Sequence, residues 1–198
     1  MFGLKFGAKK KRVEGETVTV RLNARLQPVH RGAMFEEPLA EVLTALSLGE
    51  VTGGGTQLSG DDTGVSFCDI ELTLPDAGEI AVQSLIAALE ELGAPKGSKL
   101  IVEATGAETP FGAHEGLGLF LNGTELPDEV YKTCDINHVI DEIDFLMGEK
   151  GRFRSYWEGA LDTALYCYGP SFAAMREAIE PLLASYPLCQ KARVEQVA

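Results

Sequence analysis

The sequence predicts an α+β fold of two successive units, each with the element order strand, helix, strand, strand, helix, strand. Alternating strand patterns and helical apolar spacings follow one another in this order from about residue 17 to 103, and again from about 116 to 197. Four residues around the last strand of the first unit also recur 92 positions later: Pro95, Lys99, Val102 and Glu103 return as Pro187, Lys191, Val194 and Glu195. We therefore expect an internal duplication.

The first unit opens with strict alternation over residues 17–25, with Val18, Val20 and Leu22 on one face, which is typical of a half-buried strand. Apolar residues at helical spacing from Phe35 to Leu46 predict a helix that ends before Gly49. The remaining expected elements are a weak strand over 50–58, a strand over 65–74, a helix opened by Pro75 and Asp76 and closed by Gly93, and a strand over 99–103.

The second unit repeats these patterns. Inward leucines predict a strand over 115–123, and Asp135 is placed to cap a helix whose apolar stripe runs to Met147. A connector with a short helical turn precedes that helix. The remaining expected elements are a hairpin over 152–159 and 162–169, a helix that begins at Pro170 and Ser171 and is kinked or ended by Pro181, and a strand over 192–197.

This element order usually folds into an antiparallel sheet with both helices on one face, the ferredoxin-like sandwich. The predicted fold class is therefore α+β with tandem ferredoxin-like units. The predicted organisation is a flexible basic tail over residues 1–14, a first unit over 15–105 and a second unit over 106–198. In such a unit the first and third strands are central neighbours.

The charge is divided unevenly between the tail and the body. The chain has 17 basic and 30 acidic residues, and five of the bases lie among the first twelve positions. The body therefore carries 12 bases against 30 acids, a net charge of −18. Because phosphate contacts need clustered Lys and Arg, we expect no nucleic-acid partner, and the acidic body favours a basic protein partner.

The N-terminal segment and the cysteines indicate the cellular compartment. Phe2, Leu4 and Phe6 precede the basic run, the reverse of the order in an export signal. These residues suggest a contact with an anionic membrane, but the acidic body opposes it and we do not expect one. Four scattered cysteines, and no apolar run near the roughly 20 residues of a bilayer span, predict a reduced, cytoplasmic protein.

The outward faces of the two sheets are expected to differ. In the first unit, Arg21, Asn23 and Arg25 should lie beside Asp69 and Glu71, either as solvated ion pairs or as a recognition surface. In the second, the outward residues are Phe120, Tyr166 and Tyr168 with two glycines. An apolar face of this kind packs on the other unit or on a second copy of the chain, or lines a pocket; base stacking is disfavoured by the charge.

Residues with catalytic or metal-binding chemistry are few. His30 and Arg31 precede the first helix, and His114 lies in the stretch 104–118, expected to be a linker that can line a cleft between the units. No two histidines have the spacing of metal ligands along one element, and no nucleophile setting is recognisable. We therefore predict no cofactor, no metal and no catalytic residue.

Three functions follow from these observations, in decreasing order of support. The first is a non-catalytic acidic protein that engages a basic protein partner, for example as inhibitor or immunity protein of a cationic bacterial toxin. The second is a small-molecule-binding regulatory module with its site between the two halves. The third is an enzyme that uses His30, Arg31 and His114.

Overall fold

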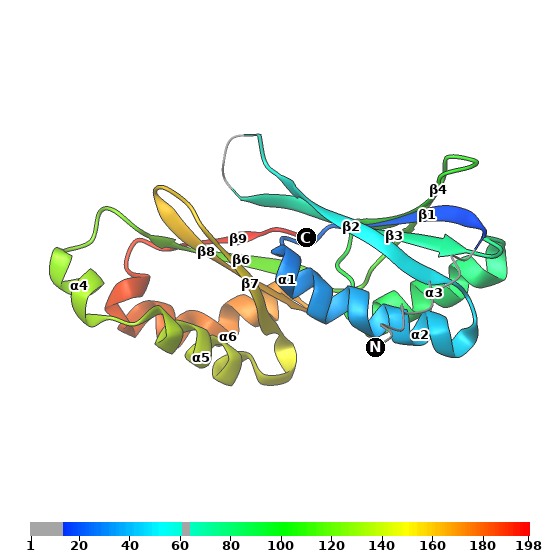
Figure 1. The fold of residues 1–198 in the computed structure, drawn as a ribbon. Helices are drawn as coiled ribbons and strands as arrows, with labels where there is room; N and C mark the ends of the chain where they lie inside the picture. Colours follow the sequence, from blue (N-terminus) through cyan, green and yellow to red (C-terminus); the bar gives the residue numbers. More distant parts are fainter. Residues whose placement is uncertain (1–13, 61–63) are drawn as a thin grey trace, which may run out of the picture.

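A computed structural model describes residues 14–60 and 64–198, and Figure 1 shows them as two units that lie side by side. In that view the strands of both units run along the upper side, with the long helices below them. The predicted basic tail lies outside the described residues except for Glu14, and so does the membrane contact weighed for it. Within the described residues, no helix is both long and apolar enough to cross a bilayer.

The first unit contains β1 (Glu16–Leu22), α1 (Pro28–Arg31), a π-helical segment η1 (Gly32–Glu36), α2 (Glu37–Leu46), β2 (Glu50–Leu58), β3 (Val65–Leu74), α3 (Glu79–Glu91), β4 (Ser98–Val102) and β5 (Ala107–Phe111). The second contains β6 (Glu115–Asn122), α4 (Asp128–Thr133), α5 (Ile136–Met147), the 3-10 turn η2 (Gly148–Lys150), β7 (Arg152–Glu158), β8 (Asp162–Gly169), α6 (Phe172–Ser185), the 3-10 turn η3 (Pro187–Cys189) and β9 (Arg193–Gln196).

The strand order confirms the predicted fold class. The first sheet has the order β2-β3-β1-β4-β5 and the second β7-β8-β6-β9, and every pairing between these strands is antiparallel. In both units the first strand lies between the third and the fourth, which is the ferredoxin-like arrangement. That the units derive from one duplicated sequence stays a prediction.

The stretch predicted to be a linker contains a strand. Residues 107–111 pair with β4, in a register that sets Ser98 opposite Phe111. The first sheet therefore extends beyond the predicted boundary at residue 105. Gly106, with φ of +68°, allows the tight turn between the two strands, and Pro110 is tolerated because β5 is an edge strand.

Several strands and helices begin or end at other residues than predicted. β1 stops at Leu22 rather than Arg25, and the first helical run starts at Pro28 rather than near Phe35. α3 begins after Gly78 rather than at Pro75, because the Asp76 carboxylate accepts the Gly78 N–H in a turn before the helix. The predicted cap Asp135 is confirmed, and α6 continues past Pro181 to Ser185.

The helices cover the inner faces of the sheets. In the first unit, Leu39 and Leu43 of α2 and Leu85 and Leu89 of α3 are buried with the apolar side of the sheet. In the second, the buried residues of α5 and α6 pack on the inward leucines of β6. The central strands then diverge: β1 alternates buried and partly exposed residues, whereas β6 and β8 are buried on both faces over most of their lengths.

Candidate ligand-binding site at the junction of the two units

The segment between β1 and η1, residues 23–31, leaves the first sheet and docks on the second. The Arg25 N–H donates to the Tyr168 hydroxyl at 2.7 Å, and the Gln27 N–H donates to Ser155 Oγ at 3.1 Å. His30 Nδ1 lies 2.9 Å from the same Ser155 oxygen. We call this contact between residues 23–31 and β7–β8 the junction; it explains why β1 ends three residues early.

The aromatic face of the second sheet, formed by Phe120, Tyr166 and Tyr168, is covered at the junction. All three side chains are buried, and they belong to the same apolar cluster as the core of the first unit. This places the aromatic face against the other unit, one of the two packings expected from the sequence. Because the face is covered within the chain, it is not open to a second copy.

The two glycines of this face allow the close approach. A Cβ added at Gly116 would lie 2.9 Å from both the Tyr168 ring and Val197, and one at Gly118 would lie 2.8 Å from the Phe120 ring. The C-terminus therefore crosses the face at contact distance, with Val197 and Gly116 joined by a backbone hydrogen bond of 2.9 Å. Figure 1 shows the C-terminus between the two units.

A pocket of about 310 Å³ opens at one end of the junction. We call it the junction pocket; it is lined by His114, Gly148, Glu149, Gly151, Arg152, Arg154, Tyr168, Gly169 and Pro170. Arg154 and Tyr168 also border a smaller void against first-unit residues that include Phe35 and Pro95. The pocket therefore lies between His114 and the edge of the second sheet, next to a void that first-unit residues border.

His114 is fixed in the pocket wall by the backbone. The Lys96 N–H donates to the His114 carbonyl at 2.7 Å, and the His114 N–H donates to the Ala94 carbonyl at 3.2 Å. Gly93, with φ of +86°, leaves room for the imidazole, since a Cβ there would lie 3.0 Å from the ring. Burial lowers the pKa of His114, and the positive charge of Arg154 lowers it further.

Arg154 owes its position to a β-bulge in β7. Phe153 pairs with Cys167 and Ser155 pairs with Tyr166, so Arg154 has no partner opposite it on β8. An extra residue of this kind in an edge strand redirects the side chain. Burial lowers the pKa of Arg154, and the like charge of Arg152 lowers it further.

The other predicted junction residues contact neighbouring side chains, although Arg25 Nε is buried without a hydrogen-bond partner among the described residues. His30 is held by Ser155, and burial lowers its pKa. The Arg25 guanidinium lies 5.9 Å from the centre of the Tyr166 ring. Burial also raises the pKa of the Tyr166 hydroxyl, which has no hydrogen-bond partner among the described residues.

The remaining predicted residues lie on the first unit. Arg21 and Asp69 form a two-pronged ion pair with both distances 2.9 Å, in the predicted cross-strand register. Glu71 is exposed and lies opposite Thr19 rather than an arginine. Asn23 caps backbone groups, its amide donating to the Lys96 carbonyl at 2.8 Å.

Arg31, considered as a catalytic residue, is instead part of a partly buried ion pair. Its Nε donates to Glu36 at 2.5 Å and its Nη1 to the Thr56 hydroxyl at 2.6 Å. The pair lies against Gly54 of β2, where a Cβ would come within 2.8 Å of the Glu36 carboxylate. Gly54 therefore allows β2 to approach this ion pair closely.

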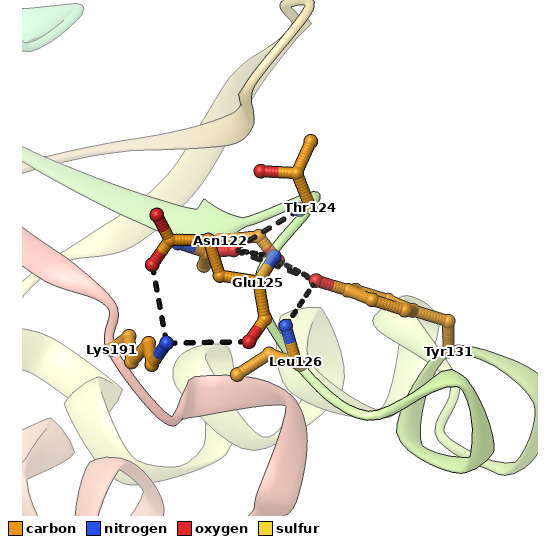
Figure 2. Close-up of polar contacts among 6 residues, drawn as sticks. All are labelled: Asn122, Thr124, Glu125, Leu126, Tyr131 and Lys191. Atoms are coloured by element: carbon orange, nitrogen blue, oxygen red, sulfur yellow. Dashed lines mark hydrogen bonds and ion pairs between the residues drawn. The ribbon is translucent and has the colours of Figure 1, made fainter.

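A second pocket, of about 400 Å³, lies at the far end of the second unit beside Asn122, Tyr131 and Cys134. Figure 2 shows the polar groups near it paired with one another: the Tyr131 hydroxyl accepts from Leu126 N–H, and Lys191 donates to the backbone and carboxylate oxygens of Glu125. Asn122 Oδ1 accepts from the N–H groups of Thr124 and Glu125. Since these partners are internal, the cluster stabilises a turn and leaves little for a ligand.

Sequence reasoning found His114 and Tyr168 but missed Arg152, Arg154 and Ser155. These three residues lie in a strand whose pattern indicates only half of a hairpin. A bulge leaves no clear mark in an alternating pattern, so no signal in the sequence singled out Arg154. Among the described residues, no group of three His, Cys, Asp or Glu side chains is placed to hold a metal ion.

No protein-family model and no curated protein matches the chain. Among solved structures it resembles TiaS in complex with a tRNA, AMPCPP and agmatine, at 12% identity and a TM-score of 0.33, over 83% of this chain and 56% of that one. It also resembles the regulatory subunit of aspartate kinase from Thermus flavus (14%, TM-score 0.28, 86% and 100% covered) and a putative monooxygenase from Lactobacillus acidophilus NCFM (11%, 0.29, 92% and 93%). At these identities the likeness concerns the fold alone.

Proposed function

We propose that this protein is a small-molecule-binding regulatory module whose ligand occupies the junction pocket. The observation that carries the proposal is the position of Arg154, a half-buried cation without an ion-pair partner among the described residues, which borders both the pocket and the void against the first unit. Pockets of about 300 Å³ and above are typical of small-ligand sites, and they occur preferentially where domains meet.

Two residues of the pocket wall are hydrogen-bonded to the first unit, so a bound ligand can affect how the two units dock. They are Tyr168, whose hydroxyl accepts the Arg25 N–H of the first unit, and His114, whose backbone is bonded to residues 94 and 96. A ligand in the pocket would contact His114 and Tyr168, the two residues bonded to the first unit, and so favour the docked arrangement. Binding to the native state alone then raises stability.

The test is a thermal-shift screen with small metabolites of every charge class, followed by two-dimensional amide NMR of the protein with each stabilising compound. We expect at least one compound to raise the melting temperature and to shift the amides of Gly151 and Gly169. Absence of any stabilising compound, or shifts confined to another face, would contradict the proposal.

A second candidate is the acidic binding protein expected from the charge of the body. The observation that favours it is Phe145 of α5, which is 79% exposed beside Asp141 and Asp144. An exposed aromatic ring among acidic residues suits a partner with apolar and basic groups, such as a cationic toxin. We expect the protein to capture a basic protein at low salt, and the capture to be lost at high salt and in the variant Phe145→Ser. Capture that neither change affects would argue against this function.

A further inference from the structure

The charges around the junction pocket are unusual for an acidic protein. Arg152 and Arg154 lie two residues apart in β7, and both line the pocket with His114. Neither arginine makes an ion pair or a side-chain hydrogen bond among the described residues, although the body has more than two acids for each base. A local surplus of positive charge therefore remains in the pocket wall.

The nearby acids do not neutralise it. The Asp144 carboxylate accepts the Phe153 N–H at 2.8 Å and attracts Arg154 only through space. Glu149 lines the pocket but is exposed and, within the described part of the chain, forms no ion pair with either arginine. Glu115, next to His114, is taken by Lys96 at 2.7 Å and by the first amide of α6, Phe172 N–H, also at 2.7 Å.

Arg31 shows how the same protein treats a buried arginine in a structural role. Its guanidinium has both a carboxylate and a hydroxyl partner. Burying a charge without a partner is costly, so structural arginines are normally paired in this way. Arg154, half-buried and aimed by a bulge beside a second arginine, lacks such partners in residues 14–60 and 64–198 and is therefore suited to a ligand that supplies them.

We infer that the ligand of the junction pocket carries a doubly charged oxyanion, of the phosphoryl class, held by the guanidinium groups of Arg152 and Arg154. Each guanidinium presents a planar fork of donors that matches phosphate oxygens, and hydrogen bonds between charged partners are the strong ones. A dianion balances two arginines, whereas a single carboxylate leaves one of them unbalanced. The inference rests on the proposed function and names its ligand class.

The experiment is a titration of the full chain with inorganic phosphate, followed by amide NMR at constant ionic strength, with sulfate and acetate as comparison anions. We expect saturable binding of phosphate and sulfate, with shifts at Gly151 and Gly169, and weak or no binding of acetate. Arg154→Gln and Arg152→Gln should each weaken phosphate binding about tenfold or more, because charge-assisted hydrogen bonds are lost.

Arg176→Gln is the matched control, since Arg176 is an exposed arginine of α6 outside the pocket, and its phosphate affinity should equal that of the wild type. Arg154→Lys keeps the charge but loses the fork, and should bind with intermediate affinity. Without any anion, Arg154→Gln should melt at or above the wild-type temperature, because it removes a half-buried charge that has no partner among the described residues. That last measurement also shows that the variant folds.

Two results would overturn the inference. One is equal phosphate affinity in the wild type, Arg154→Gln and Arg176→Gln, which would indicate a diffuse ionic effect. The other is saturable binding of a neutral or cationic compound at Gly151 and Gly169 with no binding of phosphate; the proposed function would then stand and the oxyanion would be wrong. If no compound of any class binds at these amides, both fail together.

Discussion

The outward faces of the two sheets occupy equivalent positions in equivalent folds, yet one is partly exposed to solvent and the other is buried. On the first sheet, Arg21 and Asp69 pair with each other and stay partly exposed. On the second, Tyr166 and its neighbours are buried against the first unit. A face whose charges neutralise one another needs no cover, whereas an apolar face is stable only when another element removes it from water.

This difference also locates the candidate site. Arg152 and Arg154 lie on β7, the edge strand of the second sheet, on which residues 23–31 dock. On the charged face the corresponding cations are occupied, because Arg21 is already bonded to Asp69 and the side chain of Lys99 pairs with Glu108 at 2.8 Å. Surplus positive charge beside buried aromatic surface therefore distinguishes the junction.

Truncating one aromatic ring on each face tests the difference in burial between the two faces. Tyr166 of β8 and Phe67 of β3 both lie on the outward faces of their sheets. Tyr166→Ala should lower the free energy of unfolding by about 3–5 kcal/mol, because it leaves a cavity in a buried cluster. Phe67→Ala, at a partly exposed ring, should cost about 1 kcal/mol. Urea denaturation measures both, and equal losses would mean that the aromatic face is not buried.

Glycine-to-alanine changes on the two sheets should also differ in their effect on stability, by a smaller amount. Gly118→Ala adds a methyl group within 2.8 Å of the Phe120 ring and 3.1 Å of Val197 at the C-terminus, and should destabilise by about 1–3 kcal/mol. Gly55→Ala, in the edge strand of the first sheet, meets no described atom within 4 Å and should change stability by less than about 1 kcal/mol, in either direction. Thermal melting of the two variants is sufficient, and a harmless Gly118→Ala would show that the C-terminus does not cross the face as described.

Removing each of the two tyrosine hydroxyls tests the hydrogen bond across the junction. Tyr168→Phe removes the acceptor of the Arg25 N–H and should cost about 1–2 kcal/mol. Tyr166→Phe removes a buried hydroxyl that has no partner among the described residues, so it should be neutral or slightly stabilising. Urea midpoints of both variants give the comparison, and the reverse order of stabilities would contradict the hydrogen bond across the junction.

The smallest expected effect is the dependence of stability on pH that comes from His30 and His114. The pKa values of His30 and His114 are lowered in the folded protein, so the unfolded chain binds more protons near its ordinary histidine pKa of about 6.5. Stability should therefore be fully present above about pH 6.5 and fall as the pH drops through the folded pKa values. Urea denaturation between pH 7.5 and 5.5 tests this, and His30→Gln should flatten the curve.

The control for that experiment is the double variant. A slope that persists in a His30→Gln, His114→Gln double variant would assign the effect to other groups.

Much of the fold was predictable because it depends on local patterns. Strict alternation placed Arg21 and Asp69 on the same face of neighbouring strands, and the structure pairs them in that register. Helical spacing and a capping residue located α5 and its start after Asp135. The strand β5 was missed because its few residues include Pro110 and do not alternate clearly, so only its pairing with β4 makes it a strand.

The candidate site was predictable only in part. The sequence identified His114 in the connection between the units and Tyr168 on an apolar face, since each stands out locally. It also suggested Arg31, whose partners Glu36 and Thr56 satisfy it within the first unit. It offered no reason to choose Arg154, because the bulge that redirects this residue is visible only when β7 is paired with β8.

By itself, the sequence determined the two ferredoxin-like units, their strand order and the character of each outward face, because residue periodicity decides which side chains meet the helices. Tertiary structure decided which face is covered and by what. The docking of residues 23–31 on β7 depends on hydrogen bonds between positions more than a hundred residues apart, such as Gln27 with Ser155. Contacts over such separations leave no local pattern, and the pocket that they create exists only in the folded chain.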